Sequence, residues 1–93
     1  MPLIYKIVDN TNNNCYIGST KGDLKTRIQN HKSAYRRFKA GNIPYAKAFD
    51  ILQNENYCFE VVETLDDENH RYIRERYHIE HTENAINKNI PSR

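Results

Sequence analysis

The stretch LIYKIVDNTNNNCYIG, residues 3–18, predicts a β-hairpin from which the rest of the fold can be worked out. Residues 3–8 are rich in β-branched and aromatic side chains, which is typical of a strand. Residues 9–14 are polar and dominated by asparagine, which tolerates turn geometry. The last four residues, CYIG, predict a second short strand. The hairpin therefore brings Tyr5 and Tyr16 into one neighbourhood, although the register of the two strands cannot be predicted.

The run Gly18-Ser19-Thr20 is expected to end the second strand, and a helix is predicted from about Asp23 to Phe38. An apolar stripe at helical spacing supports this helix and consists of Leu24, Ile28, His31 and Tyr35. Gly41-Asn42 ends the segment.

A second helix is predicted to start at Pro44, because proline suits the first position of a helix. Its expected buried face consists of Tyr45, Phe49 and Leu52. A third strand follows at Tyr57 to Leu65, then a long helix at Asp66 to His81, and one further turn around Ala85 and Ile86. The order strand, strand, helix, helix, strand, helix indicates an α/β protein of the α+β type.

The length of 93 residues predicts one small domain, residues 1–93, and 38% of the residues are hydrophobic. Cys15 and Cys58 lack metal-site spacing, and each lies in a strand-like run, so we expect both to be buried apolar groups. The N-terminus has no apolar signal-like segment, and no stretch approaches the ~20 apolar residues of a membrane span. We therefore expect no membrane association and an intracellular location, without distinguishing cytoplasm from nucleus.

The net charge is only +2, but the charges are segregated along the chain. Residues 55–68 hold six acids and no cation, whereas residues 21–39 hold one acid and seven cations. A basic surface of this kind suits a polyanion such as nucleic acid, although a solvated helix face is an equally good interpretation. The seven cations are Lys21, Lys25, Arg27, Lys32, Arg36, Arg37 and Lys39.

Arg27 and His31 lie one helical turn apart, where they could bind phosphate and shuttle a proton. Taken alone, the pair is better explained by an ordinary surface cation and a half-buried histidine. Glu75 shares a mostly apolar helical stripe with Tyr72 and Ile79, which are expected to be buried, so its carboxylate needs a partner. A divalent metal would serve, as would an ion pair with Arg71 or Arg76, or exposure at the edge of the stripe.

Taken together, these residues resemble the GIY-YIG endonuclease family. Leu3-Ile4-Tyr5 matches the first motif, with leucine where the family usually has glycine, and Tyr16-Ile17-Gly18 matches the second. The downstream run that contains Leu24, Arg27 and His31 and the helix around Glu75 also match. The remaining matches are Asn87 and the segment Asn89-Ile90-Pro91. The resemblance spans residues 3–91 and implies a three-stranded antiparallel sheet flanked by helices.

The resemblance also implies a DNA-cleaving activity that depends on Mg²⁺ or Mn²⁺. Glu75 would hold the metal, and Tyr5 would be the general base, its acidity raised by nearby positive charge. Tyr16 would orient water or phosphate, Arg27 would stabilise charge at phosphorus, and His31 would assist proton movement. Asn87 would be structural. The cations that would contact DNA phosphates are Lys21, Lys25, Lys32, Arg36 and Arg37.

Two other functions remain open at this level. The chain could be a non-catalytic nucleic-acid-binding module that uses the basic helix, residues 21–39. It could instead be a structural partner protein that uses the acidic stretch 55–68. If it is a nuclease, these 93 residues leave no room for a second, target-choosing domain. We therefore expect little sequence preference, a protein partner that supplies specificity, or recognition of DNA shape.

Overall fold

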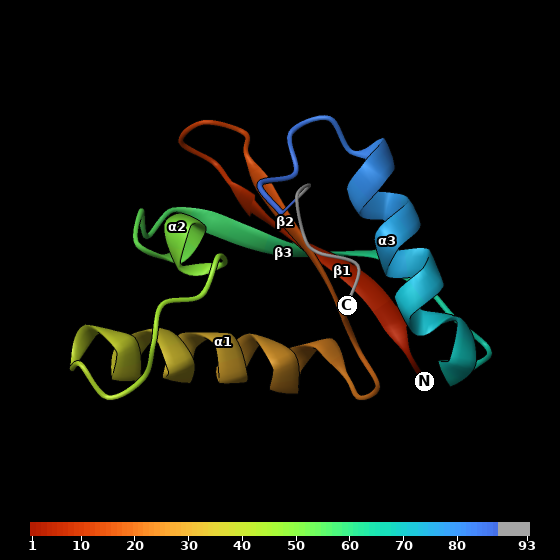
Figure 1. Ribbon diagram of the computed structural model, residues 1–93, viewed down its shortest axis with the longest axis horizontal. Helices are drawn as coiled ribbons and strands as arrows, with labels where there is room; N and C mark the ends of the chain where they lie inside the picture. Colours follow the sequence, from red (N-terminus) through yellow and green to blue (C-terminus); the bar gives the residue numbers. More distant parts are fainter. Residues whose placement is uncertain (88–93) are drawn as a thin grey trace.

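The computed structural model describes residues 1–87 and contains a three-stranded antiparallel sheet (Figure 1). Strand β1 (Leu3–Asp9) lies in the centre, between β2 (Cys15–Thr20) and β3 (Tyr57–Thr64). Both partners run antiparallel to β1. The pairing with β3 shifts by one residue between Ile4 and Tyr5, where Ile4 pairs with Glu63 and Tyr5 with Val61.

Helices cover both faces of the sheet (Figure 1). Helix α1 (Leu24–Lys39) and the single turn α2 (Phe49–Leu52) lie on one face. A 3₁₀ turn, η1 (Glu68–His70), leads into α3 (Arg71–His81), which lies on the other face. The element order and the antiparallel sheet confirm the predicted α+β fold.

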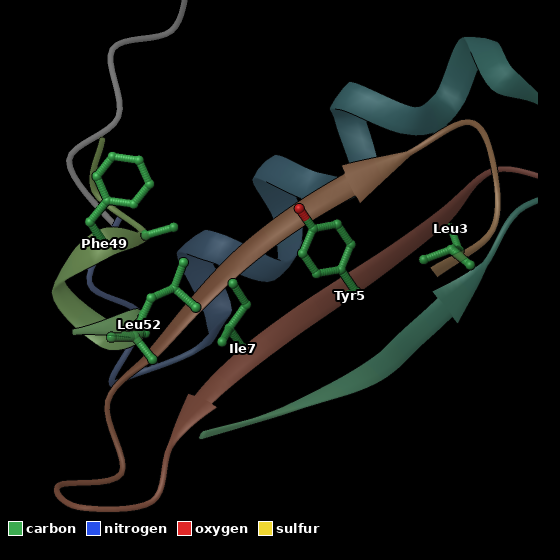
Figure 2. Packing of buried hydrophobic residues seen from close by; sticks show 7 residues of the cluster. Leu3, Tyr5, Ile7, Phe49 and Leu52 are labelled. Atoms are coloured by element: carbon green, nitrogen blue, oxygen red, sulfur yellow. The ribbon is translucent and has the colours of Figure 1, made fainter. Parts of the chain in front are cut away.

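Two apolar clusters hold these layers together because successive residues of a strand point to opposite faces. On the α1 and α2 face, Leu3, Tyr5 and Ile7 pack against Phe49 and Leu52. Figure 2 shows the three β1 side chains spaced along their strand, with Leu52 and Phe49 at the Ile7 end and Leu3 at the opposite end. The cluster on the α3 face contains Ile4, Cys15, Ile17, Leu65, Ile79 and Ala85.

Leu3, which replaces the usual glycine of the first motif, is one of these core residues. It is 9% exposed and belongs to the α1 and α2 cluster. Its backbone pairs with Thr20 on one side and with Thr64 on the other. The added bulk therefore points into the core and stabilises the strand entrance.

Three predicted boundaries were wrong. Strand β2 does not end at Gly18 but continues to Thr20, because Ser19 and Thr20 pair with Ile4 and Leu3. Helix α3 starts at Arg71 and not at Asp66, because Asp67 is extended and its carboxylate accepts a hydrogen bond from the Asn69 amide. The second helix starts at Phe49 and not at Pro44.

Three predicted burials were also wrong. Tyr45 is 54% exposed, because the side chains of α2 already fill the space against β1. Tyr72 is 65% exposed, since it points away from the sheet that Ile79 contacts. Cys58 is exposed because α3 lies over β1 and β2, so the outer end of β3 is left uncovered.

Candidate active site

The register of the hairpin places Tyr5 beside the glycine of the second motif. Tyr5 pairs with Gly18, and its ring lies across that residue. A Cβ atom at Gly18 would lie 2.5 Å from the Tyr5 hydroxyl and 2.6 Å from Cζ. In Figure 2 the hydroxyl of Tyr5 is directed across β2. Glycine is therefore needed here to make room for the phenol, which crosses β2 and reaches α1.

Helix α1 supplies two partners for the Tyr5 hydroxyl. Asp23 caps the helix by accepting a hydrogen bond from the Thr26 amide at 2.9 Å. One turn later, Arg27 Nε donates to the Tyr5 oxygen at 3.0 Å. The Tyr5 oxygen also lies 2.7 Å from His31 Nε2. Since Arg27 can only donate, the hydroxyl proton of Tyr5 is the one available for the bond to His31.

Burial determines the protonation of this pair. Burial raises the pKa of Tyr5 to about 12, against the lowering effect of Arg27. Burial, and then the charge of Arg27, lower the pKa of His31 to about 4. Arg27 lowers the pKa of Tyr5, as expected from nearby positive charge, but desolvation outweighs the guanidinium and the net shift is upward. At neutral pH the phenol is protonated and the imidazole is neutral, and in the tautomer with its proton on Nδ1, His31 Nε2 accepts the Tyr5 proton.

Tyr16 lies next to the same histidine. Its ring is half-buried, 6.1 Å from the His31 ring and nearly perpendicular to it. Burial, followed by the charge of Glu75, raises the pKa of the Tyr16 hydroxyl. Because Ile7 pairs with Tyr16 and Tyr5 pairs with Gly18, both phenols lie on the sheet face that α1 covers.

Glu75 approaches the phenols from the other helix layer. Its carboxylate raises the pKa of both Tyr5 and Tyr16, so the acid lies within electrostatic range of the two phenols. The hydroxyl of Ser19, on the edge strand β2, donates to Glu75 Oε1 at 2.6 Å. Arg71 Nη1 in turn donates to the same Ser19 oxygen at 3.2 Å.

The two ion pairs considered for Glu75 are not formed. Arg71 pairs with Glu68, and Arg76 pairs with Glu80. Within residues 1–87, no basic side chain lies in ion-pairing distance of Glu75. A half-buried carboxylate with a single hydroxyl donor keeps the capacity to bind a cation.

The donor set suits one hard divalent cation. Across the described part of the chain, no three His, Cys, Asp or Glu side chains cluster as a protein-only metal site. Mg²⁺ usually keeps several waters and is held by one or two carboxylates together with substrate phosphate. A lone carboxylate whose charge acts on both phenols therefore fits Mg²⁺ or Mn²⁺ bound jointly with a phosphodiester.

A family model described as the GIY-YIG catalytic domain matches residues 1–89 of the chain. The chain belongs to the GIY-YIG family. It therefore contains a nuclease catalytic domain, which makes it a phosphodiester hydrolase, and GIY-YIG nucleases are generally metal-dependent. Searches of curated proteins and of solved structures gave no match.

The GIY-YIG domain also uses Asn87 to hold its C-terminal segment on β2. The Asn87 side chain accepts from the Ile17 amide at 3.3 Å and donates to the Ile17 carbonyl at 2.7 Å. Two backbone bonds at Cys15 lie beside this contact, one with Asn84 and one with Ile86. The motif segment Asn89-Ile90-Pro91 lies outside the described residues.

The five cations predicted to contact nucleic acid are all exposed: Lys21, Lys25, Lys32, Arg36 and Arg37. None of them forms an ion pair within residues 1–87. Helical spacing places Arg37 on the flank of α1 that carries Arg27. Lys25, Lys32 and Arg36 share the opposite flank.

The sequence pointed neither to the bond from Ser19 to the Glu75 carboxylate nor to the bond from Arg71 to Ser19. Ser19 was visible only as the residue after the second motif, and Arg71 only as a possible ion-pair partner. Fifty-six positions separate Ser19 from Glu75. Only a prediction that continued β2 past Gly18 could have placed the Ser19 side chain opposite α3.

For the described residues, no helix is both long and apolar enough to cross a membrane.

Proposed function

We propose that this domain hydrolyses DNA phosphodiester bonds, with Tyr5 as general base and Glu75 holding one Mg²⁺ or Mn²⁺ ion. The observation that carries the proposal is the Tyr5 hydroxyl, which is shared by Arg27 and His31 within range of the Glu75 charge. A purely structural tyrosine would need neither a buried neutral histidine nor a guanidinium at its oxygen.

The phenol and the imidazole act as one proton acceptor. A phenol whose pKa is about 12 is protonated at neutral pH, so it can take a proton only by giving one up. In the proposed step, an attacking water loses a proton to the Tyr5 oxygen while the Tyr5 proton moves to His31 Nε2. The water oxygen forms a bond to phosphorus, and the P–O bond to the leaving oxygen breaks.

Arg27 has two positions in this scheme. Tyr5 has no exposed surface, so water reaches its oxygen only after a neighbouring side chain moves. An incoming phosphate attracts the Arg27 guanidinium, which then stabilises the charge that builds up at phosphorus. When Arg27 moves to the phosphate, its hydrogen bond to the Tyr5 oxygen is replaced by one from a water molecule. Tyr16 helps to orient this water.

The metal supplies Lewis-acid stabilisation of the scissile phosphate and of the leaving oxygen when it is bound. Ser19, which accepts a hydrogen bond from Arg71, would hold the Glu75 carboxylate in place for it. We assign to DNA phosphates the exposed cations of α1 and its entrance: Lys21, Lys25, Lys32, Arg36 and Arg37. Such contacts bind the DNA backbone without reading bases. Asn87 is assigned a structural role.

Two further parts of the proposal concern the cell. DNA is the proposed substrate, and an intracellular location follows from that substrate. A protein partner that supplies target specificity is proposed, because phosphate contacts alone carry no sequence information.

Plasmid nicking tests the proposed chemistry directly. Supercoiled DNA is incubated with Mg²⁺ or Mn²⁺ and wild-type protein, Glu75→Ala, or the matched control Glu80→Ala on the same helix. We expect nicking by wild type and by Glu80→Ala, and none by Glu75→Ala. Salt-sensitive DNA binding without nicking by any variant would favour the non-catalytic binding module. Equal nicking by Glu75→Ala would remove that residue from the mechanism.

A further inference from the structure

A cleft opens beside the candidate active site, and the proposed chemistry does not use most of its walls. It has a volume of about 330 Å³ and lies between α1 and the segment 43–49. Its lining includes Tyr16, Arg27 and His31, so the cleft adjoins the position proposed for the scissile phosphate. A volume of about 330 Å³ is at the small end for ligand sites.

The outer walls are flat and apolar, with one polar group. Pro44, Tyr45 and Phe49 contribute rings, and three alanines, Ala34, Ala46 and Ala48, contribute small side chains. Tyr45 is 54% exposed and stands at the rim, with its hydroxyl donating to Asp50 at 2.5 Å. Asn30 on α1 supplies an exposed amide.

This combination matches a single nucleobase. Bases stack on aromatic rings whatever their sequence, and an asparagine amide can bond the edge of a base. The sugar keeps a base within one residue length of its own phosphate, which here would lie against Arg27. A duplex does not fit into a cleft of about 330 Å³, so the base has to leave its stack to enter.

We propose that the cleft binds one unstacked nucleobase next to the scissile phosphate, with Tyr45 stacking on the base and Asn30 bonding its edge. This inference rests on the proposed nuclease function and specifies its substrate. The domain is then expected to cut at unpaired or easily unpaired nucleotides, and fully paired DNA is the poorer substrate. This gives a physical basis for the recognition of DNA shape without sequence.

An NMR titration tests the site without requiring cleavage. ¹⁵N-labelled protein is titrated with deoxyadenosine 5′-monophosphate or, as a base-free control, with deoxyribose 5-phosphate. We expect saturable shifts at the Asn30 side-chain amide and at the Tyr45 and Ala46 backbone amides with the nucleotide alone. Nucleotide shifts that map elsewhere, or equal shifts with the base-free control, would overturn the inference.

Two tyrosine variants separate stacking from general effects. Tyr45→Ala is expected to weaken nucleotide binding by about 5- to 150-fold, the range found when a stacking aromatic is removed. Tyr72→Ala, which removes an exposed tyrosine of α3, is expected to leave binding unchanged, as is the conservative Tyr45→Phe. Unchanged binding by Tyr45→Ala would contradict the assignment. Thermal melts monitored by circular dichroism confirm that each variant is folded.

A cleavage comparison completes the test. Wild type is expected to show a higher kcat/KM for a duplex with one unpaired nucleotide than for the fully paired duplex, and Tyr45→Ala is expected to lose this preference. Absence of any cleavage together with base-dependent shifts would contradict the nuclease proposal and leave the base site standing. Cleavage without base-dependent shifts would contradict the base site alone.

Discussion

Gly18→Ala should destabilise the protein, and the cause should be the Tyr5 ring alone. The added Cβ would lie 2.5 Å from the Tyr5 hydroxyl and 2.6 Å from Cζ, closer than atoms of a folded core tolerate. Gly18 does not have a positive φ, so the backbone itself can accept alanine. Overpacking of this kind costs about 1–3 kcal/mol of unfolding free energy. The phenol is also pushed away from Arg27 and His31, so nicking should fall with stability.

The sign of the effect should reverse when the ring is removed. Glycine inside a strand is less stable than alanine by about 0.5–1 kcal/mol. In a Tyr5→Leu background, Gly18→Ala should therefore be neutral or stabilising by that amount. Gly22→Ala provides the matched control, because an added Cβ there meets nothing within 4 Å.

Urea denaturation followed by far-ultraviolet circular dichroism measures all five proteins: wild type, the three single variants and the double variant. The free energy of coupling between the two positions should be about 1–3 kcal/mol, the overpacking alone, because the propensity gain of alanine is present in both backgrounds and cancels. Equal destabilisation by Gly18→Ala in both backgrounds would refute the claim that the Tyr5 ring requires this glycine.

Three further predictions concern the groups around the phenol. The pKa of His31 is about 4 in the folded protein and 6.5 in the unfolded chain, so the free energy of unfolding should fall by about 2 kcal/mol as the pH is lowered from about 8 to about 5. Urea titrations should show this loss for wild type and not for His31→Gln. Equal losses in both proteins would contradict the role of His31. Ser19→Ala should weaken Mn²⁺ binding by about 10-fold in electron paramagnetic resonance titrations, whereas Ser19→Thr should retain the wild-type affinity. An unchanged Mn²⁺ affinity of Ser19→Ala would exclude Ser19 from positioning Glu75. Arg37→Glu should lower kcat/KM for DNA cleavage more than Arg36→Glu, since only Arg37 shares the flank of Arg27; the reverse order would place the DNA on the other flank.

The sheet and the order of elements could be predicted because the strand patterns are unambiguous. Alternation in β1 sends Tyr5 and Ile7 to one face and Ile4 to the other, as expected. The second helix was harder, because a single turn has too few residues to display a period. Tyr45 then looked like a member of an apolar stripe, although it lies in a loop.

The candidate site was predictable as a set of residues and less so as an arrangement. Helical spacing and two short motifs pointed to Tyr5, Tyr16, Arg27 and His31, but spacing contains no information on desolvation. Burial raises the pKa of Tyr5, whereas the expected effect of nearby charge was a lower value. The Ser19 contact with Glu75 joins an edge strand to a helix on the far layer, and such tertiary contacts leave no local pattern.

The most direct test of the account is the anomalous difference map of a crystal grown with Mn²⁺. We expect one strong peak within bonding distance of a Glu75 carboxylate oxygen, on the side that faces the Tyr5 and Tyr16 hydroxyls. A peak on other side chains, or no peak at Glu75 under saturating Mn²⁺, would contradict the claim that these groups share one cation site.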